Sequence, residues 1–478
     1  MSDYSLGYRQ RMFAVAETGG YGAACPPTAG AFQAREAVIN LSEERRVRRD
    51  RKNHRSVGER LRGKREVKWS ITLADAPVSA AAGSRSSASS ELDPLYGATF
   101  EIRTTPAATV LAGGEQNATA PTTSGCDVAL ASGSYGSFSP GSLIGIETAD
   151  GRQAVVISEV QSFATDHRVR LSWEPALPAA PAAGTRLEPS QCYFLLTNPQ
   201  GSVTLHRALD RHGECVSGAI PNSWTFTASA GEEALIEVAG LGQDLARFGP
   251  LALSRDVGAD ATIFPVEELH AAILKNGAAF YQVAPQSLSP EIVTVVGTTP
   301  GEGEEDPGLS VIRGVASTTA KDYPAGTALT PYYPDLTTCC AAIAGIFGQV
   351  RLNDRVFEVT RAKIALTENV KLRNESFGSA VATGYLYPTD REVKVELDGF
   401  LKTGEAPWAA AARQESVGIL LQIGTEGGRI HAFYLPRVEL DVPGIEAPAD
   451  AEIPLSLAGT ALTLNEAGPN YELFHAYL

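Results

Sequence analysis

The sequence predicts a mainly β protein: two tandem copies of one strand-rich unit, with one short helix and one long hairpin loop each, plus two small β-barrel insertions. Three observations lead to this fold class. The chain carries an internal duplication, its apolar residues recur in short alternating runs, and 46 Gly and 29 Pro among 478 residues imply many turns. At about 100–200 residues per domain, the length allows roughly two to four folded units.

The duplication is carried by matches that occur in the same order in both halves. Residues 32–43 return as residues 357–368, with Phe, Ala, Ile, Leu and Glu at equal offsets. The tetrapeptide Arg-Glu-Val-Lys at 65–68 returns at 391–394, and alternating apolar residues after each copy predict a half-buried strand. Three shorter matches follow: 194–197 with 419–422, 205–206 with 430–431, and 233–240 with 452–459. Together they favour a duplicated unit of strand, long loop, strand, helix and further strands.

Each copy is expected to contain one short helix. Residues 409–412 follow Pro407, which suits the first helical position, whereas the segment that opens at Pro94 is interrupted by Gly97. The tryptophans Trp69, Trp224 and Trp408 sit in apolar surroundings and are predicted to be core or interface anchors.

A second self-similar pair predicts the two small barrels. Residues 183–189 are echoed by 325–331, and each closes a stretch of short β runs, one around an Asp150-Gly151 turn and one around a Gly/Glu-rich tip at 301–308. Residues 79–90 and 107–139 are interpreted as linkers. The expected division is residues 1–105 with 191–255 for the first unit, 106–190 for the first barrel with its linker, 256–335 for the second barrel, and 336–478 for the second unit.

Charge is unevenly distributed. Forty Lys and Arg against 55 Asp and Glu give a net charge of −15, yet residues 44–68 hold 12 basic and 4 acidic residues, a local charge of +8 that leaves −23 elsewhere. This basic arm favours an interaction role over a merely solvated loop. The equivalent loop of the second unit is similarly long and nearly neutral, so the length points to a structural role that both copies share. The arm contains no Phe, Trp or Tyr, so base stacking has no support.

The sequence contains no catalytic or metal-binding motif with the required residue spacing. The six cysteines form no CxxC pair and the seven histidines no HEXXH or HxH, so we expect free thiols in a reducing compartment and no metal, cofactor or catalytic site. His206 and His431 are interpreted as sheet residues inherited with the repeat and not as a paired site. No run reaches the roughly 18 apolar residues of a membrane helix, so no membrane insertion is expected.

The ordered motifs resemble one known family. Residues 361–366 with 370–378, residues 382–385 leading into 391–395, and residues 63–70 and 219–224 are similar to the tail tube protein (major tail protein) of long-tailed bacteriophages, here in a tandem-duplicated form. The resemblance covers roughly residues 4–240 and 340–478 and leaves out the inserted barrels. No single motif is diagnostic, and the order and the duplication carry the comparison.

The resemblance implies a β-sandwich-like fold whose inner sheets join around a ring, with rings stacked through the long hairpin loops. It implies a structural late protein of the virion tail, assembled in the host cytoplasm and forming the hollow conduit for DNA ejection. Implied partners are further copies of the chain, the tape measure protein, the tail terminator and baseplate proteins, and phage DNA in the lumen. If six tube domains make a ring, a chain with two would close as a trimer with pseudo-sixfold symmetry.

On this interpretation the two long loops carry inter-ring contacts. The expected contact residues are Arg45, Arg46, Arg48, Arg49, Arg51 and Lys52 in the arm, and Lys371, Arg373 and Asn374 in the second loop. The two barrels are expected to face outward. Two alternatives stay open: a baseplate or tail-end ring protein of the same fold, and a nucleic-acid-binding protein that uses residues 44–68.

Overall fold

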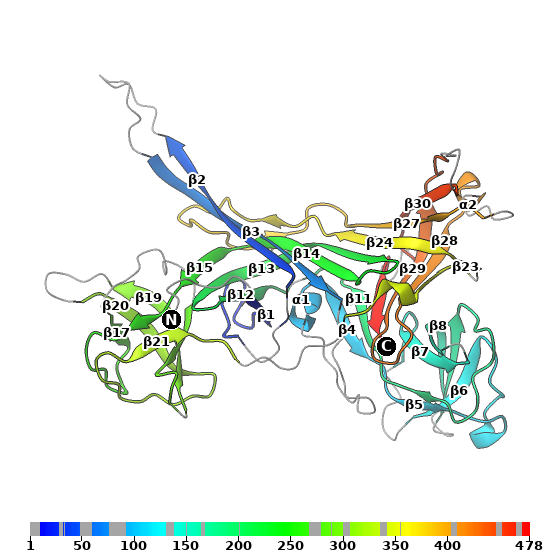
Figure 1. The fold of residues 1–478 in the computed structure, drawn as a ribbon, viewed down its shortest axis with the longest axis horizontal. Helices are drawn as coiled ribbons and strands as arrows, with labels where there is room; N and C mark the ends of the chain where they lie inside the picture. Colours follow the sequence, from blue (N-terminus) through cyan, green and yellow to red (C-terminus); the bar gives the residue numbers. More distant parts are fainter. Residues whose placement is uncertain are drawn as a thin grey trace.

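The structure is a computed structural model. It describes residues 10–27, 32, 34–47, 60–75, 92–130, 138–149, 151–163, 168–199, 201–266, 279–287, 289–299, 306–334, 342–353, 355–402, 409–445, 452–464 and 471–478. Most described residues lie in strands that form several sheets, so the predicted mainly β class is confirmed. The molecule is elongated, with a long central sheet and a smaller sheet below each end of it (Figure 1).

Eight antiparallel strands form a continuous strip along the molecule. In spatial order they are β2 (Glu36–Val47), β3 (Arg60–Ala74), β14 (Leu235–Gly242), β13 (His212–Ser229), β24 (Val359–Thr367), β27 (Glu392–Phe400), β30 (Pro454–Ala461) and β29 (His431–Leu440). Each strand pairs with the next over part or most of its length. The hairpin of β2 and β3 extends beyond the strip as an arm, away from the two smaller sheets (Figure 1).

The order of the strip repeats halfway along it. Strands β2, β3, β14 and β13 follow the same arrangement as β24, β27, β30 and β29, in both space and sequence. The halves are joined by β13 and β24, which pair from Ser223 opposite Thr367 to Ser229 opposite Arg361. One sheet therefore runs through both halves of the chain without an open edge between them.

A second layer is built by the long strands β13 and β29, which leave the strip and pair with further strands. The additional strands of the first half are β1 (Gln10–Ala16), β12 (Val203–Leu209), β15 (Asp244–Phe248), β11 (Gln191–Leu195) and β4 (Phe100–Thr104). Those of the second half are β22 (Gly348–Leu352), β23 (Arg355–Phe357), β28 (Val417–Ile423) and β31 (Phe474–Tyr477). The sets β1-β12-β13-β15 and β22-β28-β29-β31 share one arrangement, and β11 pairs with both β31 and β4.

This arrangement corrects two of the sequence matches. His206 lies in β12, the first strand of its hairpin, whereas His431 opens β29, the second strand of the corresponding hairpin. Residues 194–195 lie in β11, whose place in the sheet differs from that of β28 at 417–423. Short apolar matches of two to four residues fit neighbouring strands equally well, so they cannot fix which strand corresponds to which. Both histidines lie in strands, as predicted, and both are fully buried.

The helices α1 (Asp93–Gly97) and α2 (Ala409–Ala412) occur where the sequence predicts them. Pro94 stands in the first turn of α1, and the helix ends at Gly97; its buried residues are Leu95 and Tyr96. The described residues also include the short 3₁₀ segments η1 (Glu115–Asn117) and η3 (Gly345–Phe347).

Two six-stranded sheets lie at opposite ends of the molecule. The first contains, in order, β10 (Arg186–Leu187), β5 (Ala108–Val110), β6 (Gly125–Leu130), β9 (Arg168–Glu174), β8 (Gly151–Phe163) and β7 (Leu143–Thr148). The second contains β16 (Leu251–Ala252), β21 (Ala328–Pro331), β18 (Ala279–Val283), β19 (Glu291–Thr299), β20 (Gly308–Val315) and β17 (Ile263–Pro265). In the first sheet the two edge strands, β10 and β7, also lie beside each other. In the second sheet a β-bridge between Leu253 and Val266 links the two edges, so that this sheet nearly closes into a barrel.

The interpretation of residues 107–139 as a linker is wrong. This stretch contains β5, η1 and β6, and the buried Val110, Cys126 and Val128 contribute to the core of the first small sheet. Strands this short among Ala, Gly, Thr and Ser carry too little alternation to be seen in the sequence. The other expected linker, residues 79–90, lies outside the described residues.

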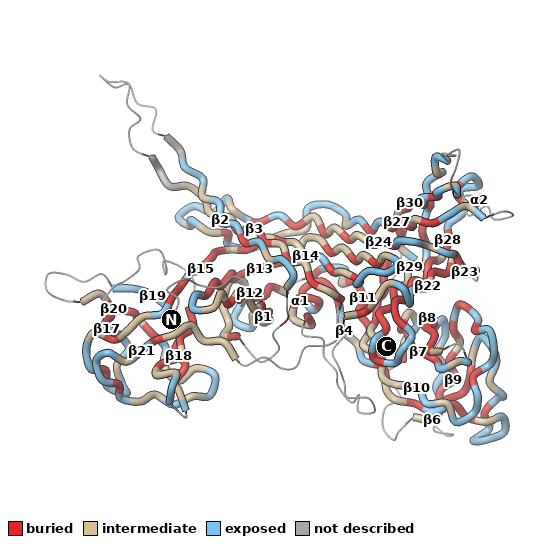
Figure 2. The backbone as a smooth tube through the Cα atoms, viewed as in Figure 1, coloured by how far each residue is buried: buried red, intermediate tan, exposed pale blue. Residues whose placement is uncertain are grey.

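The main hydrophobic core lies between the strip and the second layer. It includes Trp69 and Trp224, which are almost fully buried, as predicted, while Trp408 lies outside the described residues. Figure 2 shows buried residues along the strip and mostly intermediate or exposed ones along the arm.

Candidate assembly surfaces

The two ends of the strip carry sheet edges with no partner among the described residues. Among the described strands β2 pairs only with β3, and its Ala37 carbonyl accepts a hydrogen bond from the Arg207 side chain at 2.7 Å. Beyond β29, the amide of Asp441 donates to the carbonyl of Ala458 at 2.8 Å, so the chain continues beside β30 and leaves its other side open. Unpaired edges are ready to pair with another chain. Exposed apolar side chains lie along both edges, at Val38, Leu41, Val442 and Ile445.

The join between β13 and β24 shows what such an edge looks like when it is paired. Trp224 of β13 lies directly opposite Leu366 of β24, and both are fully buried. In the repeat, Leu366 corresponds to Leu41, which is 37% exposed. Trp224 pairs with Val238, two residues before Gly240. In the second half Leu440 pairs with the corresponding Gly459, and continuing that register past the Asp441–Ala458 hydrogen bond places Val442 opposite Leu457, so Val442 corresponds to Trp224. Val442 is 66% exposed.

The predicted contact residues of the arm are only partly within the described structure. Arg45 is exposed and pairs with Glu43 at 3.3 Å. The backbone of Arg46 lies in β2, opposite Leu61, and its side chain is not among those described. The remaining four lie outside the described residues: Arg48, Arg49, Arg51 and Lys52.

The three predicted residues of the second loop lie near a short hairpin of β25 (Lys371–Leu372) and β26 (Tyr385–Leu386). Lys371 and Arg373 are exposed, as a contact role requires. Asn374 is half-buried, and its Oδ1 has no hydrogen-bond partner in the described structure. The structure thus holds these three in one loop, separate from Arg45 in the arm.

The second loop is packed on the first half of the same chain, which the sequence did not predict. Lys64 Nζ donates to the carbonyls of Ser376 and Ser379 at 2.7 and 2.5 Å. Gln243 Nε2 donates to the carbonyl of Ala382 at 2.8 Å. An apolar cluster completes the contact, comprising Ile220, Val370, Leu372 and Ala382 with Tyr21, Leu241, Tyr385 and Tyr387 against it. The partners are up to about 370 residues apart in sequence, so no local pattern signals the contact.

One ion pair occurs at the same place in both halves. Arg65 at the arm's base binds Asp244 at 2.8 Å, and Arg391 binds Glu472 at 2.7 Å. Arg65 and Arg391 are the first residues of the repeated tetrapeptide, and the two acids stand at or just before β15 and β31. Each pair ties the second strand of its half to the second layer.

A buried polar chain lies in the core beside Tyr96 of α1. His431 Nδ1 lies 2.6 Å from Asp75 Oδ2, His431 Nε2 lies 3.0 Å from His475 Nδ1, and the Tyr477 hydroxyl donates to Asp75 Oδ1 at 3.0 Å. Burial, and then the neighbouring His431, hold the pKa of His475 well below its ordinary value. Asp75, His431 and His475 are at most 2% exposed, and aromatic rings enclose them, so this chain belongs to the core.

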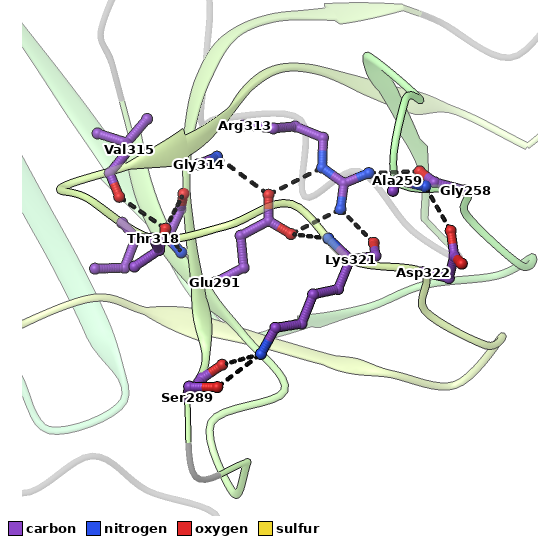
Figure 3. Close-up of polar contacts among 11 residues, drawn as sticks. Gly258, Ala259, Ser289, Glu291, Arg313, Gly314, Val315, Thr318, Lys321 and Asp322 are labelled. Carbon is purple, nitrogen blue, oxygen red and sulfur yellow. Dashed lines mark hydrogen bonds and ion pairs between the residues drawn. The ribbon is translucent and has the colours of Figure 1, made fainter.

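Each small sheet also encloses a buried carboxylate bound by arginine. Figure 3 shows Glu291, which accepts from Arg313 at 2.7 and 2.9 Å and from the amides of Gly314 and Lys321. Arg313 also donates to the carbonyls of Gly258 and Lys321, so the pair fastens two loops of that sheet. In the first sheet Asp127 accepts from Arg168, Arg170 and Thr119. Both carboxylates are fully satisfied by the protein, which makes these centres structural.

No protein family matches the sequence, and no curated protein is detectably similar to it. Among the described residues no three His, Cys, Asp or Glu side chains are grouped as metal ligands. The helices of the described part are all too short to cross a membrane. The four cysteines in that part, Cys25, Cys126, Cys192 and Cys215, are free thiols.

Proposed function

We propose that this chain is a structural protein of a phage tail tube, which assembles through its sheet edges into closed rings that stack into a conduit for DNA. The observation that supports this most is the pairing of β13 with β24. It joins two units of identical strand order edge to edge, and the equivalent edges at the ends of the strip are unpaired and partly apolar. A second copy can repeat that pairing at either end.

Repeated addition of the same contact makes a closed ring when the rotation between units fits a whole number of them. In this proposal the two units are tandem tail-tube domains, each with one helix and one long loop, and three chains supply six units. The two small sheets lie on one side of the strip, so both can remain outside a ring whose wall is the strip (Figure 1). The resemblance in the ordered motifs supports the tube over other ring-forming proteins.

The edge contact is tested by a cysteine pair. In the double variant Leu41→Cys with Val442→Cys, the new thiols face each other between neighbouring copies, as Leu366 and Trp224 do within the chain. Mild oxidation should therefore give covalent oligomers on a denaturing gel. Asn40→Cys with Val442→Cys is the matched control, because residue 40 points to the other face of β2 and should link far less. Monomer alone after oxidation of the Leu41 pair contradicts the proposed contact.

The tube itself is tested by electron microscopy of the purified protein. Stacked rings with three pairs of outward lobes are expected, since each chain carries two small sheets. Isolated particles at all protein concentrations, together with absence of the cross-link, contradict a tube protein. A single ring that never stacks points instead to a tail-end or baseplate ring.

A further inference from the structure

An acidic cavity of about 690 Å³ lies where the second loop begins and ends. Its walls include Glu368, Asp390, Glu392 and Glu472, one guanidinium at Arg391, and the end of β30 at Thr460. Arg391 pairs with Glu472 and Lys394 pairs with Glu392 at 2.9 Å, so Glu368 and Asp390 are the wall carboxylates without an ion pair in the described structure. Such a wall attracts cations and repels anions.

Glu368 is the buried member of this set. Its side chain is 3% exposed, and its Oε1 makes no hydrogen bond in the described structure. Burial raises the pKa of Glu368 to about 7, because the charged form loses hydration that the nearby Arg391 only partly replaces. A buried carboxylate with an orphaned oxygen is costly, and a cation from outside would remove that cost.

The position of the cavity corresponds to a surface that is already occupied in the first half. There the second loop packs on Lys64, Arg65, Leu241 and Gln243. The repeat places Asp390, Arg391, Thr460 and Leu462 at the corresponding points, and all four line the cavity. The surface that receives a long loop in one half is therefore open in the other.

The chemistry of the two surfaces differs in a way that matches the two loops. In the first half the apolar Ile220 and Leu241 meet the apolar Val370 of a nearly neutral loop. Ile220 and Leu241 are cross-strand partners in the first half, and Glu439 and Thr460 are the corresponding partners in the second. Glu439 is exposed. Glu43 of the first unit corresponds to Glu368 of the second. Two residues further along the chain, the arm has Arg45 and the second loop has Val370, so these two residues occupy equivalent positions. An apolar contact in one half thus has a charged counterpart in the other.

We propose that this acidic cavity, with Glu439 beside it, is the docking site for the basic arm of a second copy of this chain, and that Arg45 faces Glu439. The proposal rests on the ring contact argued above, because pairing of one copy's β2 beside residues 441–445 of the next brings the arm's base over the cavity. The arm's charge of +8 complements the carboxylates. In this proposal the tip of the arm, beyond residue 47, does not bind the cavity and can make the predicted contact with the next ring.

A charge swap tests the facing pair. Arg45→Glu and Glu439→Arg should each weaken self-association, measured by sedimentation velocity over a concentration series, by about tenfold or more. The double variant should return to within a few-fold of the unchanged protein. Two controls match this experiment. Lys68 is an exposed cation of the same hairpin, and Lys68→Glu should have little effect on self-association. Glu237 is an exposed acid of the first half, and Arg45→Glu combined with Glu237→Arg should not recover self-association. Glu368→Gln, which keeps the shape and removes the charge, should also weaken association.

The cysteine pair separates the possible failures. If Leu41→Cys with Val442→Cys cross-links while Arg45→Glu leaves association unchanged, the docking site is wrong and the ring contact stands. If the swap fails to recover association, or the Glu237→Arg control recovers it equally, the facing of Arg45 and Glu439 is overturned. If the cysteine pair does not cross-link, the ring contact falls, and the docking site falls with it.

Discussion

At the scale of single residues, the repeated ion pairs explain why the tetrapeptide Arg-Glu-Val-Lys recurs. Arg65 and Arg391 each bind an acid that is mostly or entirely buried, and removal of one partner from such a pair leaves a charge without compensation. The repeat was visible in the sequence, but its acids were not, because Asp244 and Glu472 stand at different distances from the preceding strands β14 and β30. A single buried acid has no sequence signature beyond its type.

Glu368 is expected to make the stability of the folded chain depend on pH. Its pKa rises from 4.5 to about 7 on folding, so the folded chain binds more protons than the unfolded chain between those values. Stability should therefore fall as pH increases through this window, by up to about 3 kcal/mol. Arg391 and Glu472 are the charged groups that act on Glu368, and they form an ion pair with each other.

Glu368→Gln isolates that effect. The variant should be more stable than the unchanged protein at pH 8, where the carboxylate is charged, and the difference should shrink toward zero near pH 4.5. Urea unfolding of unassembled protein at both pH values measures it. A difference in unfolding free energy that is the same at pH 8 and pH 4.5 contradicts the assigned burial.

At the scale of elements, the sequence predicts those whose signal is local. Both helices, the hairpin around Gly151 and the strand pair β19 and β20 occur where periodicity and turn residues place them. The long β2 and β3 hairpin does too. The short strands β5 and β6 were missed, since three to six small residues carry little alternation, and the pairing of β11 with β31 was invisible because its partners are far apart in sequence.

The packing of the second loop is the element whose behaviour is simplest to test. Leu372 is 6% exposed and belongs to the apolar cluster on the first half, while the adjacent Lys371 points to solvent. Leu372→Asp places a charge in that cluster and should detach the loop, because a carboxylate there has no partner. Limited proteolysis should then cut within residues 368–391 at least several-fold faster.

Lys371→Asp is the matched control for that variant. It introduces the same side chain one residue away on the exposed side, and its cleavage rate should stay near that of the unchanged protein. Equal protection in both variants means that hydrogen bonds, such as those to Lys64 and Gln243, hold the loop without the apolar cluster. Strong cleavage in both means that the loop is not packed in solution.

At the scale of the whole molecule, the uneven charge becomes a statement about assembly. A +8 arm on a chain that is −23 elsewhere favours contact between copies, since the arm of one copy meets the acidic surface of another. The same arrangement disfavours a tight contact with DNA along the rest of the surface. Contacts between exposed charges weaken as salt shortens the screening length, so assembly through the arm should be salt-sensitive.

The duplication also predicts how many chains form the smallest closed ring. One chain supplies a strip of eight strands with two units of equal order, and six units close the ring if the tube has the symmetry that the duplication suggests. The closed species should then have three times the chain mass of 50.4 kDa and show pseudo-sixfold inner and threefold outer symmetry, because the two small sheets differ in sequence. Native mass spectrometry at low salt, with the Arg45→Glu variant as a monomer-enriched control, measures the mass. A dominant closed species with any other number of chains contradicts the six-unit ring, even if the edge contact between Leu41 and Val442 forms.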